Sequence, residues 1–164
     1  MALKLLFVTQ DELWLQRLRE QCQKKDFCCD VFEDVAAAIS AYRQQSDEYS
    51  LVIVDFSGDF DGFDFTQKLR AVSTKQSILA VNSMIEPQLL LKAALSGISF
   101  FLPKAVEMDD FLALLCQISD QFKAQKKEQD EKDGLAKEYI RLRREYGEMQ
   151  VQIKKYEALL AMQQ

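Results

Sequence analysis

Histidine is absent from this chain of 164 residues. The lack of imidazole excludes every mechanism that uses it as a general base or as a metal ligand. The four cysteines include no Cys-x-x-Cys spacing, so a zinc site is not expected either. No apolar run reaches the length of a membrane span, and we expect no membrane association. Reduced thiols and a cytoplasmic location are the expectation for Cys22, Cys28, Cys29 and Cys116.

Glycine and proline are also scarce, with five and two copies. A flavin or nucleotide enzyme on a parallel sheet needs a loop rich in glycine, serine or threonine after its first strand. The corresponding segment here, VTQDE at 8–12, has no glycine and carries two acids that repel phosphate. We therefore expect a chain that is not an enzyme, with no catalytic residues and no cofactor.

Charge is unevenly divided along the chain. Residues 1–122 carry 11 basic and 18 acidic side chains, a net charge of −7, whereas residues 123–164 carry 10 and 8, a net charge of +2. The acidic first part repels nucleic acid. In the second part Arg141, Arg143 and Arg144 form a short basic group with acids beside it, which is typical of a solvated helix face. Nucleic acid is therefore not an expected direct partner.

Five short apolar runs alternate with amphipathic stretches. Runs of four to six residues are typical of buried strands, and the stretches repeat apolar residues at helical spacing. Strict alternation predicts an α/β fold, a five-stranded parallel sheet that is doubly wound, with helices on both faces. The strands are expected at 4–9, 27–32, 51–56, 77–82 and 99–102, and the helices at about 12–24, 34–44, 63–72, 87–96 and 107–122.

The chain after residue 122 is predicted to be helical in two parts. Residues 123–133 are polar all round and form a charged linker, whereas residues 134–164 carry a heptad stripe typical of a coiled coil. Because no other element covers this stripe, we expect a parallel homodimer, in which Glu138 and Arg143 attract across the interface. A helix folded back on its own domain is the alternative. The stripe consists of Leu135, Tyr139, Leu142, Tyr146, Met149, Ile153, Tyr156 and Leu160.

The segment LVIVDFSGDFDGFDFTQKLR at 51–70 resembles the receiver domain of two-component response regulators. Asp55 stands at the position of the phosphoacceptor, with Asp61-Gly62 in the loop that follows. The resemblance covers about residues 3–122, and we expect a receiver-like domain at 1–122. It implies the flavodoxin-like (βα)5 receiver fold and a role in signal transduction.

A second segment, SGISFFLPKAV at 96–106, extends the resemblance. Lys104 matches the lysine that contacts the acyl phosphate, and Phe101 matches the aromatic switch residue. The family's usual output face lies on the helix at 87–96, the strand after it and the helix at 107–122, and we expect a protein partner there. The side chains expected on this face are Leu90, Leu91, Phe101, Phe111 and Leu115.

The departures from the family concern its acidic pocket. Receivers carry two adjacent acids after the first strand, which hold Mg²⁺, but this chain has Thr9 and Gln10 there. Asp11 follows at the start of a helix, where acids are favoured by the helix dipole. Receivers carry a hydroxyl residue after the fourth strand, which is the other switch position. This chain has Asn82 there, with Ser83 next.

The pocket is therefore expected to hold Asp55 and Lys104 alone, whose charges balance without a metal. A hard divalent cation prefers several charged oxygens, so Mg²⁺ binding should be weak or absent. Because Mg²⁺ neutralises a transferring phosphoryl group, we expect a direct Asp55–Lys104 ion pair and slow or absent phosphotransfer. As an alternative, Asp59 or Asp61 turns into the pocket as a substitute ligand.

The sequence thus favours a receiver-like signalling module that is atypical or independent of phosphorylation, and that dimerises to control an output domain or partner. The main alternative is a functional phosphoreceiver that accepts phosphate on Asp55 from a histidine kinase. A structural coiled-coil scaffold with a globular recruitment head also stays open.

Overall fold

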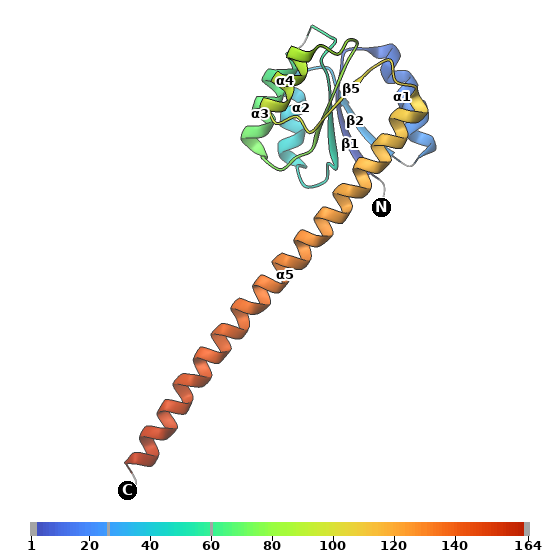
Figure 1. The fold of residues 1–164 in the computed structure, drawn as a ribbon. Coiled ribbons are helices and arrows are strands. Elements are labelled where there is room, and N and C mark those ends of the chain that lie inside the picture. The colour runs from blue at the N-terminus through green and yellow to red at the C-terminus, as the bar shows by residue number, and fades with distance from the viewer. Residues whose placement is uncertain (1–2, 26, 60, 163–164) are drawn as a thin grey trace. The chain divides into compact units, whose positions relative to one another are not determined.

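In the computed structural model, five parallel strands form one sheet in the order β2-β1-β3-β4-β5. Figure 1 shows this sheet between its helices. This structure describes residues 3–25, 27–59 and 61–162. It divides into two compact units, Met1–Asp120, which holds the sheet, and Gln121–Gln164. The α/β receiver fold predicted from the sequence is confirmed. The strands are β1 (Leu3–Val8), β2 (Phe27–Phe32), β3 (Leu51–Asp55), β4 (Ile78–Asn82) and β5 (Phe100–Pro103).

Helices cover both faces of the sheet because alternate side chains of the central strands are apolar on both sides. The helices are α1 (Glu12–Lys24), α2 (Val35–Gln44), α3 (Gly62–Val72), α4 (Pro87–Leu95) and α5 (Met108–Ala161). Leu5 of β1 packs in one core with α1 and the start of α5, and its neighbour Leu6 packs in the other with α2 and α3. Both side chains are fully buried. This two-sided burial is typical of parallel sheets.

Two side chains expected on the output face belong to the core instead. Phe111 and Leu115 of α5 are buried against the sheet, so that part of the prediction is wrong. They share the apolar side of α5 with Leu112 and Ile118, and this side faces the strands. Leu90 and Leu91 on α4 are exposed, as expected.

Helix α4 has the ends that its sequence predicts. Pro87 stands in its first turn, where the missing N–H costs no hydrogen bond. Gly97 follows the helix with a φ of 79°, and the N–H of Ile98 donates to the carbonyl of Ala93 at 3.1 Å. A left-handed residue at this place ends a helix while satisfying its last carbonyls.

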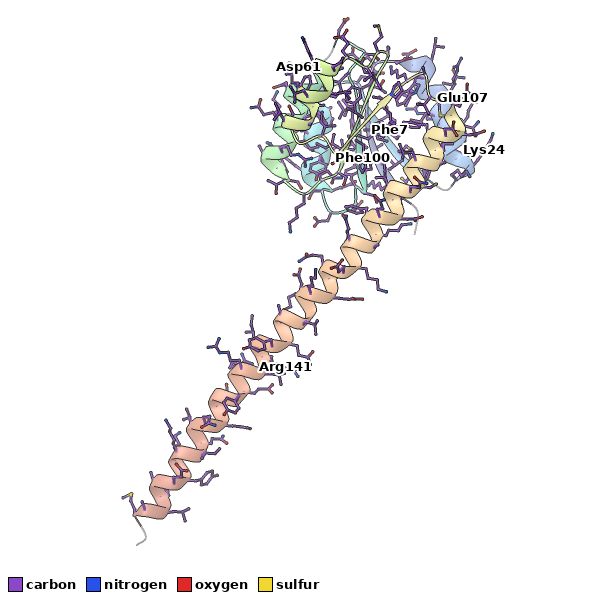
Figure 2. The ribbon with its side chains drawn as sticks, viewed as in Figure 1. Phe7, Lys24, Asp61, Phe100, Glu107 and Arg141 are labelled. Carbon is purple, nitrogen blue, oxygen red and sulfur yellow. The ribbon has the colours of Figure 1, made fainter. Side chains whose placement is uncertain are left out.

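Helix α5 continues through the charged segment 123–133 without a break. Ion pairs one turn apart support it there, with Lys132 Nζ 2.6 Å from Glu128 Oε1. From Lys123 to Met162 every described side chain is exposed in the single chain, as the region around Arg141 illustrates (Figure 2). Within the ranges that the structure describes, no helix is long and apolar enough to cross a membrane.

Candidate functional site

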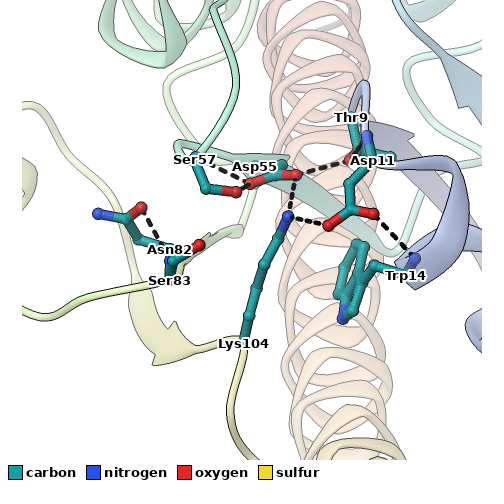
Figure 3. Close-up of polar contacts among 8 residues, drawn as sticks. All are labelled: Thr9, Asp11, Trp14, Asp55, Ser57, Asn82, Ser83 and Lys104. Carbon is teal, nitrogen blue, oxygen red and sulfur yellow. Dashed lines mark hydrogen bonds and ion pairs between the residues drawn. The ribbon is translucent and has the colours of Figure 1, made fainter.

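Polar residues gather where four strands end. Thr9 follows β1, Asp55 ends β3, Asn82 ends β4 and Lys104 follows β5. Because the strands are parallel, their carboxyl ends lie along one edge of the sheet, the usual place for a site in this class of fold. Figure 3 shows that Asp55 is joined by hydrogen bonds and ion pairs to Thr9, Ser57 and Lys104.

Asp55 lies at the centre of this cluster, and its side chain is only 2% exposed. Its Oδ1 accepts hydrogen bonds from the backbone N–H and the hydroxyl of Ser57, at 2.9 and 2.5 Å. Its Oδ2 accepts from the Thr9 hydroxyl at 2.7 Å and lies 2.6 Å from Lys104 Nζ. The direct Asp55–Lys104 ion pair expected from the sequence is therefore present. Since a carboxylate offers about four lone-pair positions, every one of them has a partner.

The Lys104 ammonium is held on three sides. Nζ lies 2.6 Å from Asp55 Oδ2 and 2.8 Å from Asp11 Oδ2. It also lies 5.3 Å from the centre of the Trp14 ring, within the range of a cation–π contact. The side chain is 11% exposed, so these contacts are largely shielded from solvent. Lys104 therefore bridges two carboxylates that come from different strand ends (Figure 3).

Asp11 is a pocket residue that the sequence did not reveal. It is the N-cap of α1, where its Oδ1 accepts the Trp14 N–H at 3.0 Å while its Oδ2 contacts Lys104. Hydrogen bonds from Lys104 and from the Trp14 N–H lower the pKa of Asp11. The expected pocket of Asp55 and Lys104 alone, with no net charge, is wrong. Two carboxylates face one ammonium, which leaves a net charge of −1.

The two residues that replace the family's acid pair have separate roles. Thr9 is buried, donates its hydroxyl to Asp55 and accepts the Asp11 N–H at 3.1 Å. Gln10 is exposed, and its amide donates to the carbonyl of Glu33 at 3.4 Å, away from Asp55. Only one of the two positions therefore contributes to the pocket, and it does so with a neutral group.

Of the switch positions, Asn82 contacts its own loop and Phe101 contacts the loop after β3. Asn82 accepts the N–H of Ser83 and donates to the carbonyl of Met84, both at 2.9 Å. Ser83 is exposed. Phe101 is half-buried, with its ring centre 6.4 Å from that of Phe56, the residue after Asp55. Asn82 is thus engaged by the loop after β4, and Phe101 packs beside the β3–α3 loop.

The β3–α3 loop is ordered by capping and aromatic packing. Asp61 is the N-cap of α3 and accepts the N–H groups of Phe63 and Asp64 at 3.0 and 3.1 Å. The rings of Phe56 and Phe63 meet edge to face with centres 4.8 Å apart. Asp59 is exposed. Neither Asp59 nor Asp61 is among the partners of Asp55 in the described residues.

The residues present do not fit the Mg²⁺ ion that the receiver resemblance implies. Among the described parts of the chain, no three His, Cys, Asp or Glu residues form a group that would hold a metal. The two carboxylates that do approach each other, Asp11 and Asp55, are bridged by the ammonium of Lys104. A hard divalent cation needs several oxygens around it, and here a positive charge already lies between them.

Sequence reasoning missed three contributors: Asp11, Ser57 and Trp14. Asp11 stands three residues before Trp14 at a helix start, which signals a cap but not a contact with Lys104. Ser57 follows Asp55 by two residues, the spacing at which an aspartate accepts from a nearby backbone N–H. Nothing local indicates that the Trp14 ring lies beside Lys104.

Comparison with known proteins agrees with the fold. No curated protein matches the chain. A receiver domain protein of the CheY-like type from Methanospirillum hungatei superposes with a TM-score of 0.66 and 13% identity, covering 76% of this chain and 99% of that one. The non-phosphorylated HemR receiver domain from Leptospira biflexa gives 0.65 and 22%, covering 72% and 94%. A two-component response regulator from Clostridium difficile gives 0.63 and 25%, covering 71% and 95%.

The family model of the response regulator receiver domain matches residues 5–115, which is more than half of the chain. The matched range contains most of β1, all of β2 to β5 and the cluster around Asp55. The chain belongs to the response regulator receiver domain family.

Proposed function

We propose that this chain is an atypical receiver, which takes part in signal transduction without being phosphorylated on Asp55. The observation that carries the proposal is the Lys104 ammonium between the carboxylates of Asp55 and Asp11. The chain itself supplies the positive charge that balances Asp55. The conformation of the pocket is then set by folding and does not depend on a phosphoryl donor.

The chemistry of phosphotransfer supports this proposal. A carboxylate oxygen must be free to attack phosphorus, and a cation must neutralise the transferring group. Both oxygens of Asp55 already have two partners each. Lys104 provides one positive charge, but Asp11 and Asp55 already oppose it with two negative ones. A phosphoryl group entering this pocket adds about two further negative charges, so we expect its transfer to be slow.

The direct test treats the full chain with acetyl phosphate and millimolar Mg²⁺ and measures its intact mass. We expect no phosphoryl adduct on the wild type. A parallel Mg²⁺ titration uses the fluorescence of Trp14, the single tryptophan, which lies beside Lys104. This signal is expected not to saturate in the low-millimolar range. Ready labelling of Asp55, or a saturating titration, contradicts the proposal.

A restored acid pair provides the matched control. The double variant Thr9→Asp/Gln10→Asp places two carboxylates at the positions where receivers carry them. We expect it to gain a saturable Mg²⁺ response that the wild type lacks, because Thr9→Asp adds a carboxylate beside Asp55. This variant shows that Trp14 reports on metal binding when binding occurs.

The alternative is a phosphoreceiver that accepts phosphate on Asp55 from a histidine kinase. One observation favours it, since Asp11 supplies a second carboxylate within 2.8 Å of Lys104. The variant Asp55→Asn keeps the shape of the side chain and separates the two functions. Signalling in cells that survives this change supports the atypical receiver, and signalling that is lost supports the alternative.

We also propose that the chain dimerises through its tail. The eight stripe residues, from Leu135 to Leu160, are 48% to 68% exposed in the single chain, and a coiled coil would bury them. Leu142→Lys puts a charge into the stripe and should give a monomer by light scattering. Ile140→Lys is the matched control, since Ile140 is also exposed but lies outside the stripe. A wild type that is monomeric contradicts this proposal.

A protein partner on the face of α4, β5 and α5 completes the proposed function. Leu91 and Leu95 on α4 are exposed, at 64% and 81%, and apolar side chains exposed close together are common at binding surfaces. The dimer would present two such faces to an output partner in the cytoplasm. Leu91→Lys should weaken capture of that partner and leave the dimer unchanged.

A further inference from the structure

The side chains of the tail favour one orientation, parallel or antiparallel, for the two helices of a dimer. This inference rests on the proposed dimer. In the heptad, Leu135 occupies a d position and Tyr139 an a position, and the alternation continues to Leu160. A second copy of the chain is the partner that fits, because its stripe has the same length and spacing. Charges on either side of the stripe then decide the orientation.

Two of the three arginines in the tail have partners within their own helix. Arg141 Nε lies 3.4 Å from Glu145 Oε1, and Arg144 Nε lies 3.9 Å from Glu148 Oε1. Both pairs span one helical turn, the spacing at which side chains of one helix meet. These charges are therefore at least partly balanced before any partner binds.

Arg143 and Glu138 differ from these residues, because neither has an opposite charge four residues away in the sequence. Arg141, three residues after Glu138, is paired with Glu145 instead. Four residues before and after Arg143 stand Tyr139 and Gly147, and glycine and leucine occupy the same places around Glu138. Neither side chain forms an ion pair in the region of α5 that the structure describes. Four ion pairs between other side chains are present there. Glu138 and Arg143, which both flank the stripe, are thus left for contacts between chains.

The heptad places Glu138 at a g position and Arg143 at the following e position. In a parallel coiled coil, a g residue faces the e residue five places later in the partner. We propose that Glu138 of each copy pairs with Arg143 of the other, and that these two symmetric salt bridges fix a parallel dimer in register. In an antiparallel dimer with its apolar layers aligned, Arg143 would approach Glu157 instead, and Glu138 would face uncharged side chains.

Charge reversals in the full chain test this orientation. Glu138→Arg and Arg143→Glu each place like charges at both contacts of the parallel dimer, so each should weaken dimerisation roughly tenfold in sedimentation equilibrium. The double variant Glu138→Arg/Arg143→Glu restores opposite charges and should regain the affinity of the wild type. Lys137→Glu is the matched control, because Lys137 lies at an f position away from the stripe, and its affinity should stay unchanged.

Mixing the two single variants gives an independent readout. In the parallel arrangement their heterodimer has attractive charges at both contacts, so the mixture should associate more tightly than either variant alone. A double variant that stays weak, with no gain on mixing, shows an antiparallel dimer, since the reversed charge at position 143 then faces Glu157. That result overturns the orientation and leaves the dimer standing, whereas a wild type that is monomeric overturns both.

Discussion

The pocket around Asp55 and the tail after Lys123 differ in where their side chains find partners. In the pocket, Thr9, Ser57, Lys104 and Asp11 satisfy one another and Asp55. Across the described residues, no buried side-chain nitrogen or oxygen lacks a hydrogen-bond partner. In the tail, eight apolar side chains in register are exposed along one helix.

This difference indicates which part of the molecule should respond to protein concentration. Contacts within one chain do not depend on protein concentration, so the pocket should have the same structure in a dilute and a concentrated solution. Contacts between chains follow mass action, so the state of the tail should change with concentration. A receiver whose pocket is internally closed can still carry a signal through such a tail.

The largest effect is expected from removing the charge at the centre of the pocket. Lys104→Met leaves the carboxylates of Asp55 and Asp11 without their shared cation, and breaking a buried pair in this way costs about 3 kcal/mol. The free energy of unfolding by urea measures this loss. If the pocket and the tail are as different as proposed, dimer affinity stays unchanged in the same variant.

An exposed lysine provides the comparison for this prediction. Lys68 forms an ion pair with Asp64 at 2.7 Å, but both side chains are largely exposed. Lys68→Met should therefore lower the free energy of unfolding by less than about 1 kcal/mol. Equal losses of unfolding free energy in Lys104→Met and Lys68→Met would show that burial does not determine how strongly the Lys104 contacts stabilise the fold.

Two glycine-to-alanine substitutions should change stability in opposite directions, one lowering it near the pocket and one raising it in the tail. A Cβ on Gly62 would lie 2.7 Å from the Phe56 ring, and that ring is flanked by Phe63 and Phe101. Gly62→Ala should lower the free energy of unfolding by about 1–3 kcal/mol. A Cβ on Gly147 meets no atom within 4 Å, so Gly147→Ala should stabilise the tail helix by up to about 1 kcal/mol, seen by circular dichroism. Destabilisation by Gly147→Ala would reveal a close contact there.

The smallest effect concerns acid pH. Lys104 and the Trp14 N–H lower the pKa of Asp11 in the folded chain. The contribution of this carboxylate to stability is therefore complete at a pH above the pKa that Asp11 has in the unfolded chain. It is lost as the pH falls below about 4. In Asp11→Asn, the slope of the unfolding free energy against pH should be shallower in that range. Because Asp11 is partly exposed, the change should be modest, and tail dimerisation at neutral pH should not differ.

Much of the fold was predictable because it follows from local patterns. Strand and helix bounds differ from the expected ones by at most one residue, apart from the end of α5, which lies at Ala161. Asp55 and Lys104 were predicted to meet because both match pocket residues of the receiver family and their charges balance. Asp11 was missed because its contact with Lys104 joins residues 93 positions apart, and a cap residue gives no local sign of which distant side chain it meets.

The sequence by itself determined the alternation of strands and helices, the apolar stripe of the tail and the loss of the acid pair at Thr9 and Gln10. Each follows from residue type and spacing within a short stretch of chain. Only the tertiary structure decided that Asp11 shares Lys104 with Asp55, and that Phe111 and Leu115 are buried. Those outcomes depend on how α1 and α5 pack on the sheet, which brings together residues that no local pattern connects.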